Sequence, residues 1–167
     1  MKKIMIGAAL AVAALAASAQ TTGVYGEVAY GTIQAKNFGD AGMVRLTVGK
    51  ELTPNIALEG QLGAGTSTNS LVGNLVGVKV DSMVGAFVKA KYDVTPQVEV
   101  FGKMGYARGN FTAHVGNMQV RAHDSDAAYA VGAKIALSKT SSIGVDYTQY
   151  GNDSSLSTTM ASYQLKF

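Results

Sequence analysis

The residue types best suited to chemistry gather in one polar segment of the chain. Both histidines, His114 and His123, lie in it, and Asp124 and Asp126 follow the second one. Imidazole and carboxylate groups are metal ligands, and a histidine close to Ser125 can activate that hydroxyl for acyl transfer. Two histidines nine residues apart match no specific metal-binding spacing, and no glutamate follows His123 to orient its imidazole. We therefore expect a solvated polar loop here, with no catalytic residue, no metal site and no bound cofactor.

The remaining chemically capable side chains are charges that recur at alternate positions of apolar segments. Residues 97–108 show the pattern, with Val98, Val100 and Met104 in one phase and Glu99 and Lys103 in the other. Period two is typical of β-strands with two unlike faces. We expect eight strands, each near the ~9 to 11 residues that a tilted strand needs to cross a membrane, over residues 23–33, 43–52, 55–65, 82–92, 97–108, 127–138, 142–151 and 157–167.

The N-terminal segment predicts export. Lys2 and Lys3 precede an apolar run from Ile4 to Ala17, and Ala17-Ser18-Ala19 follows, which is the pattern of a Sec signal peptide. We expect residues 1–19 to be removed and residues 20–167 to form one domain. Two of the 14 basic residues lie in the signal, so the rest of the chain nearly balances its 11 acidic residues. This balance excludes the basic footprint of a nucleic-acid-binding protein.

The lengths of the connections alternate. Short links carrying turn residues follow strands two, four and six, at Thr53-Pro54, residues 93–96 and residues 139–141. Longer links span residues 34–42, 66–81 and 109–126, with a brief one near residues 152–156. Short periplasmic turns and longer outer loops are typical of bacterial outer-membrane barrels. The prediction is an all-β fold, an eight-stranded antiparallel up-and-down transmembrane β-barrel.

Alternation alone does not decide which face points inward, because a soluble barrel with an apolar interior alternates in the same way. The polar face combines charges with many glycines, and glycine weakens an exposed strand but suits a narrow lumen. We therefore place the polar face inside and expect ion pairs there, because an unpaired buried charge is costly. The expected network closes the lumen and comprises Glu27, Arg45, Glu51, Glu59, Lys89, Lys91, Glu99, Lys103, Lys134, Asp146 and Lys166. Of these, we place Glu27, Glu59, Lys89, Lys134 and Asp146 at similar depth.

Aromatic residues on the apolar face fall near the expected strand ends. Interfacial girdles of aromatic residues are typical of membrane barrels. We assign Tyr30, Tyr106 and Tyr129 to an outer girdle, and Tyr92 and Phe167 to a periplasmic one.

Three parts of the sequence carry a family pattern: Val88 to Pro96 (VKAKYDVTP), the pair Ala130 to Lys134 (AVGAK) and Ile143 to Tyr147 (IGVDY), and Tyr163 to Phe167 (YQLKF). With these segments, the chain resembles the OmpA/OmpX-like, opacity-protein-like family of eight-stranded outer-membrane barrel domains. In the last segment, Tyr163, Leu165 and Phe167 are similar to the C-terminal signal read by the outer-membrane assembly machinery. The resemblance implies residence in the cell outer membrane.

Because this family includes structural proteins, adhesins and narrow channels, membership leaves the activity open. We favour a structural or adhesin-like surface-interaction role for a monomer that is not an enzyme. A narrow channel for small or apolar solutes is the alternative, and a lipid A-modifying enzyme is a minor one. Lipopolysaccharide phosphates are expected partners of Lys36, Lys79, Arg108 and Arg121, and host or cell-surface ligands are candidate partners of the loops. The apolar segment 70–80 suggests a protruding hairpin with an edge for strand addition.

Overall fold

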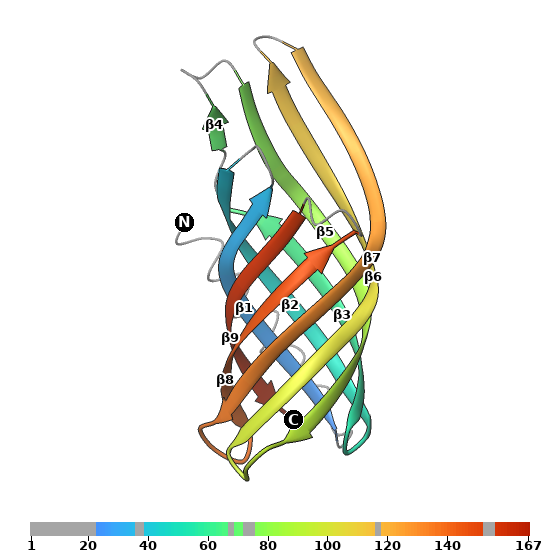
Figure 1. Ribbon diagram of the computed structural model, residues 1–167, viewed down its shortest axis with the longest axis vertical. Coiled ribbons are helices and arrows are strands. Elements are labelled where there is room, and N and C mark those ends of the chain that lie inside the picture. Colours follow the sequence, from blue (N-terminus) through green and yellow to red (C-terminus); the bar gives the residue numbers. More distant parts are fainter. Residues whose placement is uncertain (1–22, 36–38, 67–68, 72–75, 116–117, 152–155) are drawn as a thin grey trace.

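Nine antiparallel strands form one sheet that closes into a barrel in the computed structural model, which describes residues 23–35, 39–66, 69–71, 76–115, 118–151 and 156–167 (Figure 1). The strands are β1 (Val24–Ala35), β2 (Gly39–Thr53), β3 (Ile56–Gly65), β4 (Asn69–Leu71), β5 (Val76–Asp93), β6 (Val98–Val115), β7 (Met118–Ala136), β8 (Ser141–Tyr150) and β9 (Leu156–Lys166). Among the described residues, no helix has the length and apolar character that a membrane crossing needs.

Eight of these strands make the barrel, as the alternation predicts. Their order is β3-β2-β1-β9-β8-β7-β6-β5, and pairing between β3 and β5 closes the ring. The short strand β4 pairs only with the outer part of β5 in the described residues. We call the end with connections at residues 54–55, 94–97 and 137–140 the turn end, and the opposite end, at the top of Figure 1, the extended end.

The strands reach further toward the extended end than predicted. The prediction of a loop at residues 109–126 is wrong, because β6 and β7 pair continuously from Val98↔Ile135 to Val115↔Met118. The predicted loop at residues 34–42 is likewise too long, because β1 extends to Ala35 and β2 begins at Gly39. In place of the expected loop at residues 66–81, the structure describes β4 paired with the first residues of β5. The prediction that residues 70–80 form a protruding hairpin falls partly on residues 72–75, which lie outside the described ranges.

The barrel has its apolar face outside and its polar face inside, as predicted. Tyr30 and Val131 point outward and are 62% and 64% exposed. The alternate positions are buried, including the charged residues Glu27, Arg45 and Lys134. Such a surface suits a lipid environment, whereas in water it would expose a broad apolar band.

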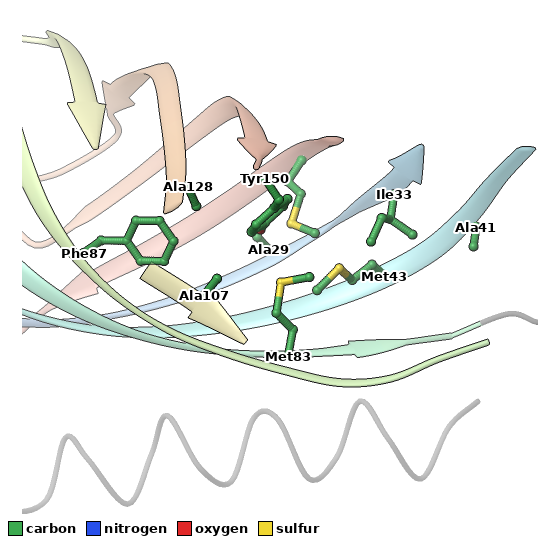
Figure 2. Packing of buried hydrophobic residues seen from close by; sticks show 10 residues of the cluster. Ala29, Ile33, Ala41, Met43, Met83, Phe87, Ala107, Ala128 and Tyr150 are labelled. Atoms are coloured by element: carbon green, nitrogen blue, oxygen red, sulfur yellow. The ribbon is translucent and has the colours of Figure 1, made fainter. Parts of the chain in front are cut away.

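The interior has two layers of different chemistry. The layer nearer the turn end is charged, and the layer above it is an apolar cluster that includes Met43, Met83, Phe87, Tyr150 and Met160 (Figure 2). The charged layer contains buried acidic and basic side chains, including Glu27, Arg45 and Lys134. The apolar layer was not predicted.

Candidate functional site: a layered barrel interior

Arg45 on β2 joins two acidic side chains across the lumen. Its Nη1 and Nη2 donate to Asp146 on β8, with distances of 2.9 Å to Oδ2 and 2.5 Å to Oδ1. The same Nη2 lies 3.4 Å from Glu27 Oε1 on β1. All three side chains are at most 2% exposed. This two-pronged geometry is the strongest form of an arginine–carboxylate contact.

Lys134 on β7 extends this chain of contacts to two further strands. Its ammonium donates to Glu27 Oε2 and to the side-chain oxygen of Gln164 on β9. Thr148 also donates to Asp146 Oδ2, at 3.2 Å. The connected side chains therefore link β1, β2, β7, β8 and β9 through the interior.

A second cluster surrounds Glu59 on β3. The Nζ of Lys103 lies 2.7 Å from Glu59 Oε2, and the hydroxyl of Tyr25 donates to Oε1 at 2.7 Å. The side-chain amide of Gln61 donates to Oε2 at 3.1 Å. Both carboxylate oxygens are thus hydrogen-bonded or ion-paired, as a buried carboxylate requires.

A third cluster lies closest to the turn end. Lys89 pairs with Glu99 at 2.5 Å, and Lys91 pairs with Glu51 and lies 3.7 Å from Glu99. Lys166 reaches Glu51 Oε1 at 3.1 Å. This cluster is partly solvated, because the side chains of Lys166 and Glu51 are 40% and 24% exposed.

One aromatic ring lies among three of these cations. The ammonium groups of Lys89, Lys103 and Lys134 are 4.5, 5.0 and 5.4 Å from the centre of the Phe101 ring. Each of these distances is within cation–π range. Each lysine also pairs with a different acid, so the ring and three carboxylates together hold three like charges close to one another.

All eleven charged residues that the sequence places on the polar face take part in at least one of these ion pairs. Arg45 joins Glu27 to Asp146, and Glu27 in turn binds Lys134, whereas Lys89 pairs with Glu99 from the neighbouring strand. Sequence reasoning missed Tyr25 as a lumen residue. The signal was present, because Tyr25 lies two positions before Glu27 and therefore shares its phase.

The apolar layer fills the interior between this network and the extended end. Met43 and Met160 are fully buried, and a cavity of about 10 Å³ is left beside Met43, Met83, Phe87 and Tyr150. That volume is near the minimum for one water molecule. The Met43 methyl packs against Gly63, where a Cβ would lie 2.1 Å from it, so a larger residue at this position would require the end of the Met43 side chain to move.

Below the network, a polar vestibule opens at the turn end. It has a volume of about 250 Å³, and its walls include Lys91, Glu99, Lys134, Ser138 and Lys166. The vestibule therefore reaches Lys134 from the turn end, where the buried ion pairs begin.

The strand register sets the two histidines apart along the β6–β7 hairpin. The register pairs His114 with Gln119 and His123 with Asn110, so the two histidines lie four positions apart along the hairpin, or about 13 Å. Ser125 pairs with Arg108 and accepts a hydrogen bond on its backbone oxygen from Tyr106. Within the described ranges, no group of three His, Cys, Asp or Glu residues could hold a metal ion.

The aromatic residues assigned to the girdles lie on the outer face of the barrel. Tyr30, Tyr92, Tyr106 and Tyr129 are exposed, and Phe167 is half-buried. The backbone N–H of Phe167 donates to the Val24 carbonyl, which attaches the C-terminal residue to β1. Tyr163 and Leu165 follow the same outward phase on β9.

Comparison with known protein families gives a match that covers nearly the whole chain. A family model described as "Outer membrane protein beta-barrel domain" matches residues 5–166. A search of curated proteins found no match.

Several solved structures share the fold. The N-terminal β-barrel domain of Pseudomonas aeruginosa OprF is 18% identical, with a TM-score of 0.66 over 89% of this chain and 100% of that one. The attachment invasion locus protein Ail of Yersinia pestis is 12% identical, with a TM-score of 0.61 over 88% and 100%. Neisserial surface protein A is 13% identical, with a TM-score of 0.58 over 86% and 96%. At these identities the likeness concerns the fold alone.

Proposed function

Because the chain belongs to the outer membrane protein β-barrel domain family, we propose that it is a non-conducting, non-enzymatic barrel that displays an interaction surface outside the cell. Its place is the cell outer membrane. In barrels of this kind the short turns face the periplasm. The extended end then faces outward.

The observation that carries this proposal is an outer sheet that continues beyond the closed part of the barrel. Pairing of β3 with β5 stops at Gly63↔Met83, and pairing of β7 with β8 stops at Ala128↔Tyr150. Beyond those points, β5, β6 and β7 remain paired with one another up to Val76, Val115 and Met118, and rise above the other strands in Figure 1. A hairpin needs no such extension to cross a membrane, so the added length is suited to contacts outside it.

The outer sheet offers two means of recognition. In the described part of the chain, residues 118–124 of β7 pair with β6 alone, which leaves a backbone edge suited to strand addition. The register also places Lys79 and Arg121 on either side of Thr112. Two basic residues in one cross-strand row favour an anionic glycan, such as lipopolysaccharide or a sulfated host polysaccharide. Ail has been solved in complex with the heparin analogue sucrose octasulfate.

The interior supports the non-conducting part of the proposal. A solute would have to separate the buried contacts of Arg45 and Lys134 and then pass Met43, Met83 and Met160. Opening the first layer leaves charges unpaired in a narrow lumen, which costs several kcal/mol per ion. The narrow-channel alternative has the vestibule in its favour, because this space already admits solvent as far as Lys134.

Shortening the outer hairpin tests the surface role. Residues 110–123, bounded by the register pair Asn110↔His123, are replaced by Asn-Gly, a two-residue hairpin turn. The shortened protein is expected to keep its heat-dependent mobility shift on a detergent gel, because the closed barrel is untouched. It is expected to lose retention on a heparin column and binding to lipopolysaccharide vesicles. Equal binding by the full-length and shortened barrels would contradict the proposal.

Conductance in a planar bilayer tests the closed lumen. The full-length barrel is expected to give no stepwise ion currents. Reproducible single-channel steps would instead support the narrow channel.

A further inference from the structure

We propose that a groove on the lipid-facing side of β2, β3, β5 and β6 holds one acyl chain of an anionic glycerophospholipid of the periplasmic leaflet, with the lipid phosphate bound by Lys50. The proposal rests on the membrane location of the barrel and is independent of the surface role of the outer sheet.

The groove is an indentation in an otherwise bulky apolar face. It is a shallow depression with a volume of about 550 Å³. Gly60 and Ala86, which pair across β3 and β5, supply little side chain, and a Cβ on Gly60 would meet nothing within 4 Å. Larger apolar side chains border this strip, namely Val48, Leu58, Val88 and Met104.

The groove rises obliquely from the turn end into the membrane. One cross-strand row runs Lys50↔Leu58, Leu58↔Val88 and Val88↔Met104. Lys50 is three positions from the turn end of β2, whereas Val88 and Met104 are five and six positions from the turn ends of β5 and β6. The row spans three strand spacings, or about 14 Å. An acyl chain that starts near Lys50 therefore enters the hydrocarbon region as it follows the row.

Lys50 supplies the polar end of the site. Among the outward-facing strand positions whose side chains the structure describes, the charged residues are Asp40, Lys50 and Arg108, and of these three Lys50 alone lies toward the turn end. A lysine on the lipid face is destabilising unless its ammonium reaches the interface or finds an anion. A lipid phosphate at the periplasmic interface satisfies this need.

Two substitutions test separately the contributions of the groove and of the Lys50 charge to lipid binding. Gly60→Leu fills the groove, and the open space around Gly60 lets the variant fold, which the mobility shift on an unheated gel verifies. Lys50→Gln removes the charge and keeps the groove. The matched control is Ala161→Leu, which places the same leucine side chain at an exposed outward position on β9.

Native mass spectrometry of the detergent-purified barrel, titrated with phosphatidylglycerol, measures the bound lipid. We expect one retained lipid on the wild type and on A161L, none on folded G60L, and affinity about fivefold weaker for K50Q, the ratio expected for one basic residue at an anionic surface. Unchanged retention by G60L, or by K50Q, would overturn the proposal. A dimer of the wild type that G60L dissociates would place a second copy of the chain in the groove, and would also overturn it.

Discussion

Replacing Arg45 with methionine is expected to destabilise the barrel by about 3–5 kcal/mol. The substitution keeps an unbranched, apolar side chain and removes the charge that joins Asp146 to Glu27. Glu27 keeps Lys134 as a partner, but Asp146 is left with the Thr148 hydroxyl. Most of the loss is therefore expected to come from Asp146, a buried carboxylate without a counter-ion.

A second substitution tests this assignment. In the double variant R45M/D146N the uncompensated charge is gone, so the double variant is expected to be about 2 kcal/mol more stable than R45M alone. Lys166→Met is the matched control, because it removes a partly exposed partner of Glu51 that Lys91 also binds. Its expected cost is below about 1 kcal/mol.

Urea unfolding of the protein in lipid vesicles measures these free energies. Far-UV circular dichroism is the suitable probe, because the chain contains no tryptophan, and the folded fraction on unheated gels provides an independent reading. Equal losses for R45M and K166M would refute the reasoning. So would a double variant less stable than R45M, because the Arg45–Asp146 contact would then not be an energetically coupled pair.

Two further predictions concern the fit of Tyr25. Gly49→Val places a Cβ 2.2 Å from a ring carbon of Tyr25, so we expect the free energy of unfolding to fall by about 1–3 kcal/mol in the same urea assay. Gly60→Val is the control, because a Cβ at this position meets no atom within 4 Å, and its stability should stay within about 0.5 kcal/mol of the wild type. Equal effects of the two substitutions would show that Tyr25 moves freely. Tyr25→Phe removes a 2.7 Å hydrogen bond to Glu59 and is expected to cost about 1.5–3 kcal/mol, and a loss below about 0.5 kcal/mol would mean that Lys103 and Gln61 suffice for this carboxylate.

The faces of the strands could be predicted because a membrane barrel imposes period two on the chain. At the turn end the predicted and observed limits agree within a few residues, since Pro54 and Pro96 interrupt the pattern there. At the extended end the prediction failed for a physical reason. Beyond the membrane no lipid requires an apolar face, so residues 110–126 can be polar and still pair as strands. The one local signal was Gly116-Asn117, a dipeptide typical of two-residue hairpins.

Which charged side chains form ion pairs with one another was harder to predict than which side chains face the lumen. Ion pairs depend on the stagger between strands, which alternation does not specify. The register sets Lys89 directly beside Lys103, an unfavourable pair of like charges, and the conflict is resolved because the two side chains reach different acids, Glu99 and Glu59. The sequence analysis did not predict the apolar layer, because Met43, Met83 and Phe87 occupy the same inward-facing positions along their strands as the charged residues. Alternation shows which face of the sheet a residue lies on, but it does not show how far along the barrel axis the residue lies.

Pairing of the first strand, β1, with the last, β9, makes assembly of the barrel a late and cooperative event. The strand that supplies Glu27 pairs along its length with the strand that supplies Gln164, and both side chains bind Lys134. A growing chain therefore lacks some of its interior partners until its final strand is made. Such a topology has high contact order, which slows folding. Since unpaired charges and open strand edges are costly in hydrocarbon, a chain lacking β9 should remain outside the bilayer, so that entry into the membrane itself selects for complete barrels.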